Sequence, residues 1–93
     1  MLTLTIKKEW FDRIASGEKR IEYRRLSPYY ERLFTSGKKY TAVTFHYYRR
    51  ERLHCNVVRI RKIPKPAALA GSTYLTGSEC WAIYLSHPEV FTV

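Results

Sequence analysis

The chain has 93 residues, of which 45% are hydrophobic, and it carries 17 Lys and Arg against eight Asp and Glu, for a formal net charge of +9. This length supports one hydrophobic core and this composition excludes wholesale disorder, so we expect a single domain over residues 1–93. The strong positive charge favours nucleic acid or a nucleotide as the partner, although net charge also serves solubility alone.

The sequence gives no support for a disulfide framework or a metal site. Cys55 and Cys80 are the only two cysteines, and none of His46, His54 and His87 has a partner at a recognised ligand spacing. We therefore expect no metal and no cofactor. No apolar run reaches the roughly 18 residues of a membrane span, and the N-terminus lacks the apolar block of a signal peptide. We expect a cytoplasmic protein that does not bind membranes, and the oligomeric state stays open.

The first elements follow from hydrophobic periodicity. Residues 2–6 alternate apolar and β-branched polar side chains, which predicts a strand with one buried face. Over residues 7–16 the apolar positions change to the spacing of a helix, with Trp10, Phe11 and Ile14 on one face. We expect this apolar face to pack over one end of the sheet.

The stretch from Gly17 to Arg25 is crowded with charge, since six of its nine residues are ionised at neutral pH. Its glycine predicts a turn after the helix, and apolar residues then alternate with Glu22 and Arg24 in a second strand. In an unbroken strand Lys19 and Glu22 point to opposite faces. We expect them to share a site only if Lys19 lies in the turn or a bulge shifts the parity.

Later in the chain we expect a second short helix and three more strands. Ser27-Pro28 is typical of a helix start, because the serine oxygen caps free amides and proline suits the first helical position. Adjacent Val57 and Val58 indicate a bulge or burial on both faces of one strand, and His87-Pro88 is expected to end the last strand. The expected elements are a helix at 28–34, strands at 40–48, 53–63 and 81–86, a charged hairpin connection at 49–52 and a loop at 71–79.

Four or five strands with two short helices predict an α+β domain built on a small, mostly antiparallel barrel that is closed or nearly closed. The order strand, helix and then Gly17-x-Lys19-x-x-Glu22-x-Arg24, preceded by Leu4-Thr5-Ile6-Lys7-Lys8-Glu9-Trp10-Phe11, resembles the opening of ASCH domains, which are related to the PUA family of RNA-binding modules. The resemblance is specific over residues 2–25 and looser over 40–63 and 81–85. It implies a PUA-like barrel and RNA as the partner.

Lys19 and Glu22 are the candidate catalytic pair. A lysine beside a carboxylate can act as base or nucleophile, but the same pair is also typical of a salt-bridged strand end. The resemblance implies a catalytic lysine at Lys19 in relatives that hydrolyse acetylated cytidine, and a small hydroxyl residue where this chain has Glu22. That departure argues against the same chemistry, and Glu79 is the one candidate for a further catalytic carboxylate. An amidohydrolase or a ribonuclease using Lys19 stays the alternative function.

Basic and aromatic residues are interleaved along the chain, which is the mixture that binds single-stranded or structured RNA. Cationic side chains neutralise phosphates and exposed aromatic rings stack on unpaired bases, although many of the tyrosines are expected to pack in the fold. No recognition helix for the duplex major groove is apparent. We therefore favour an RNA-binding module, with candidate binding residues Arg24, Arg25, Arg49, Arg50, Tyr23 and Tyr48.

Overall fold

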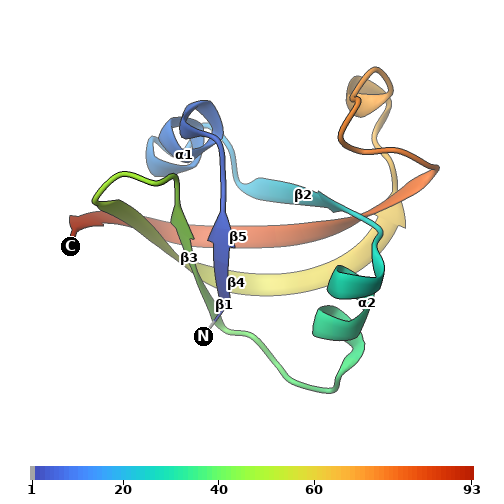
Figure 1. Cartoon of the computed structure of the whole chain (residues 1–93), viewed down its shortest axis with the longest axis horizontal. Coiled ribbons are helices and arrows are strands. Elements are labelled where there is room, and N and C mark those ends of the chain that lie inside the picture. The colour runs from blue at the N-terminus through green and yellow to red at the C-terminus, as the bar shows by residue number, and fades with distance from the viewer. Residues whose placement is uncertain (1) are drawn as a thin grey trace.

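The first helix forms where the apolar periodicity predicts it. In the computed structural model, which describes residues 2–93, α1 spans Lys8–Ala15 and buries Phe11 and Ile14 against the sheet (Figure 1). Gly17 follows it with φ of 84°, a left-handed conformation that glycine adopts without steric cost. The chain can therefore turn sharply after α1 and enter the next strand.

The second helix begins at the predicted serine and proline. α2 spans Pro28–Thr35, and the Ser27 hydroxyl accepts a hydrogen bond from the Tyr30 backbone N–H at 3.2 Å. Proline at the first helical position needs no such acceptor, because it has no N–H. Neither α1 nor α2, the α-helices of residues 2–93, has the length and apolar content that a bilayer crossing needs.

The five strands of residues 2–93 form one mixed sheet with the order β1-β3-β4-β5-β2. β1 and β3 pair in parallel, whereas β3–β4, β4–β5 and β5–β2 pair antiparallel. The sheet curls into a half-barrel, which confirms the small α+β fold (Figure 1). The strands are β1 (Leu2–Thr5), β2 (Ile21–Arg25), β3 (Ala42–His46), β4 (Glu51–Pro64) and β5 (Glu79–Thr92), with a short 3-10 turn, η1 (Ala67–Leu69), between the last two.

The two edges of the sheet, β1 and β2, do not pair with each other in the described chain, so a half-barrel is seen where a closed or nearly closed barrel was predicted. A side chain spans the gap instead, because Arg24 of β2 donates from Nη2 to the backbone carbonyl of Thr5 in β1 at 2.9 Å. Figure 1 shows β1 and β2 on the same side of the curled sheet. The bridge places the charged stretch of the sequence at the opening of the half-barrel.

The hydrophobic core lies between the concave side of the sheet and α1. Buried side chains from β1, β3, β4 and β5 meet the helix there, and α2 adds partly buried rings from its inner side. Trp10, expected on the same buried face as Phe11, is only partly buried at the edge of this core. The largest fully buried side chains are Ile14, Val43, Phe45, Leu53, Cys55, Cys80 and Ile83.

The expectation that His87-Pro88 ends the last strand is wrong, because β5 continues to Thr92. The register with β4 shifts at this point, where His54 faces Glu89 but Asn56 faces Ser86. Between these pairs β5 has one residue more than β4, which forms a bulge, and a proline is tolerated in a bulge because it need not donate to the ladder. A second register shift, between Val57 and Arg59, confirms the bulge that the adjacent valines indicated.

The connection between β3 and β4 lies two residues earlier than the sequence suggested, at 47–50 instead of 49–52. β3 ends at His46 and β4 already begins at Glu51, inside the stretch expected to be the connection. Tyr47 and Tyr48 therefore belong to the turn and not to a strand, and Tyr48 has a positive φ of 31°. That turn brings Tyr48 to the surface beside the start of α1.

Candidate functional site

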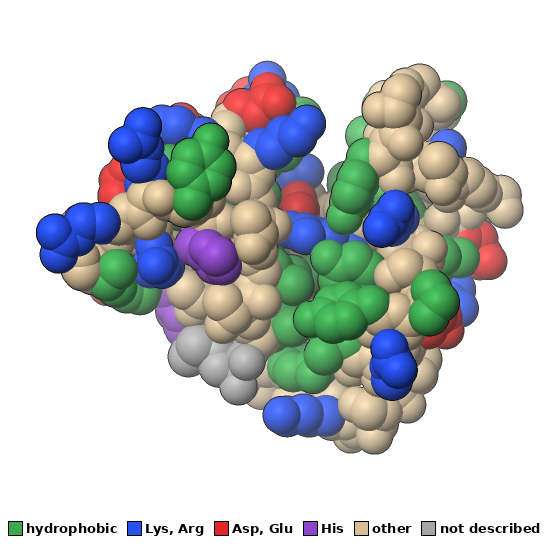
Figure 2. All heavy atoms as spheres, viewed as in Figure 1, with side chains coloured by type: hydrophobic (Ala, Val, Ile, Leu, Met, Phe, Trp, Pro, Cys, Tyr) green, Lys and Arg blue, Asp and Glu red, His purple; other side chains and the backbone are tan. Residues whose placement is uncertain are grey.

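A cleft of about 870 Å³ lies at the opening of the half-barrel. One wall is the end of β1 with the first turn of α1, and the opposite wall is the loop between η1 and β5. Figure 2 shows the hollow between these two parts of the surface, with basic and acidic side chains side by side at its bottom. The lining residues are Thr5–Trp10, Lys19, Glu22–Arg24, Tyr47, Tyr48, Ala68, Leu69 and Gly71–Leu75.

The floor of the cleft is a chain of three charged side chains, Lys19, Glu22 and Arg24. Both carboxylate oxygens of Glu22 contact cations, with Lys19 Nζ 3.3 Å from Oε1 and Arg24 Nη2 2.9 Å from Oε2. Glu22 and Arg24 are 6% and 7% exposed, so these charges are almost fully removed from water. Two cations against one anion leave the floor with a net positive charge.

Arg24 is fixed from three sides. Besides its contact with Glu22, it donates from Nη1 to the Tyr30 hydroxyl at 3.0 Å and from Nη2 to the Thr5 carbonyl at 2.9 Å. Burial, the largest influence, lowers the pKa of the guanidinium, but Glu22, Tyr30 and Tyr74 together outweigh it, so the net pKa lies above the usual value. Arg24 is therefore a permanent cation that ties β2, β1 and α2 together.

Lys19 lies in the turn before β2, which is one of the two arrangements that allow it to share a site with Glu22. Its backbone N–H donates to the carbonyl of Arg13 at 3.0 Å, so the turn is tied to the end of α1. Its Nζ lies 4.8 Å from the ring centroid of Trp10 and 5.4 Å from that of Tyr23. The Lys19 ammonium is thus held between a carboxylate and two aromatic faces, which attract cations.

A family model described as the ASCH domain matches residues 4–86 of the chain. The chain belongs to the ASCH domain family. This family is part of the PUA-like superfamily, and the half-barrel with two helices is consistent with that fold. Separate comparisons with curated proteins and with solved structures find no match.

The rim of the cleft in this ASCH domain is aromatic. It consists of Trp10, Tyr23, Tyr48 and Tyr74, each from a different element or turn. Tyr48 is 91% exposed and Tyr74 is 47% exposed, so both rings are open to a ligand. Such rings provide stacking surfaces for planar groups.

The structure brings five of the eight candidate residues together. Lys19, Glu22, Arg24, Tyr23 and Tyr48 all line the cleft. The other three candidates are the arginines at 25, 49 and 50.

Arg25 lies beside the rim with its guanidinium 5.7 Å from the ring centroid of Tyr74. Arg49 and Arg50 lie outside the cleft, in the turn between β3 and β4, and Arg50 donates from Nε to the Val93 carbonyl at 2.7 Å. Glu79 begins β5 opposite Pro64 and also lies outside the cleft.

Two contributors to the cleft were missed by sequence reasoning. The helical periodicity predicts Trp10 on the core face of its helix, and the composition of residues 71–79 predicts only a loop. The available signal was Tyr74, an aromatic ring inside a run of Gly, Ser and Thr that offers it nothing to pack against. Residues 2–93 hold no group of three or more His, Cys, Asp or Glu side chains placed to bind a metal ion.

Proposed function

We propose that this domain binds single-stranded RNA, with an unpaired nucleotide in the cleft. The observation that carries the proposal is the combination, in one cleft, of a cationic floor and a rim of four aromatic rings. Cationic groups attract the phosphates and the rings stack on bases, at roughly 1 to 3 kcal/mol for each stacked base. Domains of the ASCH and PUA-like type typically bind RNA, which supports the same partner.

The dimensions of the cleft support a nucleotide as the bound unit. Its 870 Å³ falls within the range of roughly 300 to 1,000 Å³ that is usual for small-ligand sites. A base that stacks there must be unpaired, because a duplex keeps both faces of each base covered. The α-helices of residues 2–93 are eight residues each and both pack on the sheet, so single strands fit the surface better than a duplex groove.

The charge of the lining supports an anionic ligand. Lys7, Lys8, Lys19 and Arg24 line the cleft against Glu9 and Glu22. The whole chain carries a formal net charge of +9, and this charge attracts polyanions over distances comparable with the Debye length.

A hydrolase that uses Lys19 is the second candidate. The observation in its favour is that Lys19 and Glu22 lie 3.3 Å apart inside a cleft large enough for a nucleoside. Against it, both oxygens of Glu22 already contact cations, and Glu79, at the start of β5, does not line the cleft. Binding is therefore the function that the geometry supports better.

The test is fluorescence anisotropy with a labelled pool of random-sequence single-stranded RNA, in a salt series from about 50 to 200 mM. We expect saturable binding that weakens steeply with salt, because each phosphate contact releases counterions. Absence of binding at the lowest salt, or binding that is insensitive to salt, would contradict the proposal.

The second candidate is tested in the same preparation. The protein is incubated with acetylated cytidine and with the RNA pool, beside the Lys19→Ala variant, and the products are separated by chromatography. Turnover that vanishes in Lys19→Ala supports the hydrolase. Retention of intact RNA, weakened by the same substitution, supports the binding module.

A further inference from the structure

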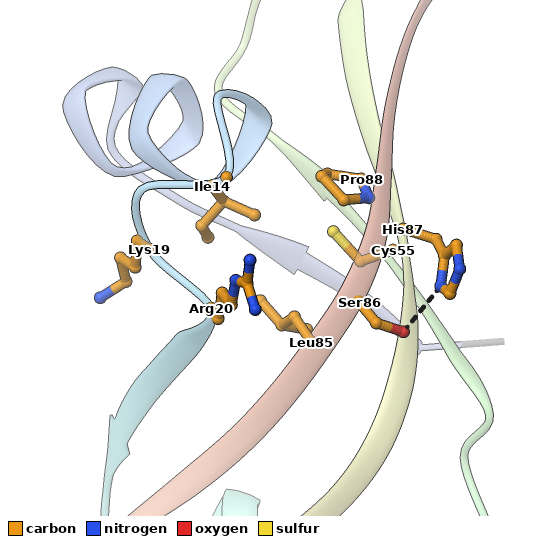
Figure 3. A pocket seen from close by; sticks show the side chains of 9 residues that line it. Ile14, Lys19, Arg20, Cys55, Leu85, Ser86, His87 and Pro88 are labelled. Atoms are coloured by element: carbon orange, nitrogen blue, oxygen red, sulfur yellow. Dashed lines mark hydrogen bonds between the residues drawn. The ribbon is translucent and has the colours of Figure 1, made fainter.

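A second cavity, of about 250 Å³, lies on the other side of the turn that carries Lys19 (Figure 3). We call it the Arg20 cavity. Ile14, Cys55, Leu85 and Pro88 give it apolar walls, and its polar side chains come from Lys19, Arg20, Ser86 and His87. No Asp or Glu lines the Arg20 cavity, so its lining is positively charged. In the cleft, by contrast, Glu22 partly neutralises the cations of the floor.

Lys19 lines both the cleft and the Arg20 cavity. In Figure 3 its ammonium points away from the Arg20 cavity, and that ammonium contacts Glu22 in the cleft. The two cavities therefore adjoin at this residue of the turn.

Arg20 is the cation of this cavity. Its backbone carbonyl accepts a hydrogen bond from Leu85 N–H at 2.8 Å, which fixes its main chain against β5. Within residues 2–93 its side chain makes no ion pair, hydrogen bond or stacking contact with another side chain. Figure 3 shows the guanidinium between Ile14 and Leu85, directed toward the middle of the cavity.

The bulge in β5 supplies the other polar groups. Ser86 and His87 stand at the register shift opposite Cys55, and His87 has a positive φ of 51°. The His87 Nδ1 and the Ser86 hydroxyl lie 3.1 Å apart, so the two side chains form one polar pair (Figure 3). Bulges commonly re-aim side chains, and here Ser86 and His87 both line the cavity while their side chains are directed toward each other and away from Arg20 (Figure 3).

We propose that the Arg20 cavity binds the backbone phosphodiester of the nucleotide next to the one in the cleft, so that the RNA strand crosses the turn at Lys19. A guanidinium without an acidic partner is a group that binds phosphate oxygens. The cavity is less than a third of the volume of the cleft, and its apolar walls suit a ribose and not a stacked base. This inference rests on the proposed RNA binding and adds the path of the strand.

The test combines affinity with nuclear magnetic resonance, using a random-sequence single-stranded RNA of ten nucleotides. Arg20→Gln removes the charge and is compared with Arg32→Gln, an exposed arginine of α2 that lines neither cavity. We expect Arg20→Gln to weaken binding about tenfold and to lower the slope of log affinity against log salt by about 0.7, the value for one phosphate of a single strand. Arg32→Gln is expected to leave both within twofold.

The amide spectrum separates the two cavities. The Trp10 indole N–H reports on the cleft, and the backbone amides of Ser86 and His87 report on the Arg20 cavity. A mixture of the four ribonucleosides, which carry no phosphate, is expected to shift the first signal only, whereas the RNA shifts all three. RNA that shifts Trp10 alone and binds Arg20→Gln as tightly as the original chain would overturn the Arg20 site while leaving the proposed function intact. RNA that shifts none of them would overturn the proposed function itself, and the Arg20 site with it.

Discussion

Glu22 and Arg24, on the floor of the cleft, are 6% and 7% exposed, whereas Tyr48, on its rim, is 91% exposed. The floor is held by ion pairs and hydrogen bonds that join three elements, and the rim rings have few such contacts. A substitution on the floor is therefore expected to act on folding, and a substitution on the rim on ligand binding. Four substitutions, taken from the largest expected effect to the smallest, separate the two regions.

Arg24→Met should give the largest loss of stability. It removes one partner of a buried ion pair and the bridge between β2 and β1, and such a loss costs roughly 3 to 5 kcal/mol because the other charge stays buried. Urea unfolding followed by tryptophan fluorescence measures it. The matched control is Arg25→Met, the next residue of the same strand, whose exposed side chain should change the unfolding free energy by less than about 0.5 kcal/mol. Equal effects for both arginines would show that the floor does not hold the fold.

Trp10→Ala tests a residue that belongs to both regions. Its ring packs partly on the core and also faces Lys19, so we expect a loss of about 1 to 2 kcal/mol in unfolding free energy, below the roughly 3 to 5 kcal/mol of a fully buried aromatic ring. Phe11→Ala, at 2% exposure, should show that larger loss. RNA affinity is expected to fall about tenfold in Trp10→Ala, the equivalent of one lost stacking contact. An unchanged RNA affinity in Trp10→Ala would show that the Trp10 ring does not contact the RNA.

Tyr48→Gly is expected to weaken RNA binding without weakening the fold. The positive φ of Tyr48 is strained for any residue with a Cβ, so glycine should raise the unfolding free energy by about 1 kcal/mol or less, after its own entropic cost. Affinity should fall about five- to tenfold through the lost ring. The control for binding compares Tyr48→Ala with Tyr29→Ala. Tyr29 is also exposed, but it lines neither the cleft nor the Arg20 cavity. A similar loss of affinity in both would point to general surface effects.

The buried interior beneath both regions can be tested by pH. Burial raises the pKa of the Cys55 thiol to about 11, above its value in the unfolded chain. Between pH 9 and 11 the unfolded state loses this proton while the folded state keeps it, so stability is present below pH 9 and falls as pH rises. At pH 10 the loss due to Cys55 should be about 1 kcal/mol. In Cys55→Ala the decrease in unfolding free energy between pH 8 and pH 10 should be smaller by about 1 kcal/mol, as measured by urea unfolding at the two pH values.

The parts of the site that depend on local chain geometry could be predicted from the sequence. The parity of β2 allowed Lys19 to meet Glu22 only from the turn or through a bulge, and the structure places Lys19 in the turn with a 3.3 Å contact to Glu22. The cap at Ser27 and the bulge near Val58 also follow from neighbouring residues alone. These features need only a few consecutive residues to specify them.

The opposite wall of the cleft could not be predicted in this way. Tyr74 faces Arg25 only because the loop after η1 folds back toward β2, and nothing within that loop specifies the direction. Arg49 and Arg50 lie outside the cleft, and local charge density does not say how far a hairpin turn lies from a cleft. The extension of β5 past Pro88 likewise depends on the partner strand, whose register absorbs the one extra residue.

The side-chain bridge from Arg24 to Thr5 has a consequence for the order of folding. β4 and β5 are joined by one loop and pair over most of their length, whereas Leu2 must find Val43 before β1 has a place in the sheet. Contacts distant in sequence form late because closing the longer loop costs more entropy. The opening of the half-barrel is then the last part to assemble and the first to open by local unfolding, so amides of β1 and β2 should exchange with solvent deuterium before those of β4 paired with β5. A ligand held across that opening protects the least stable seam of the fold, and the gain in protection on RNA binding should be largest in β1 and β2.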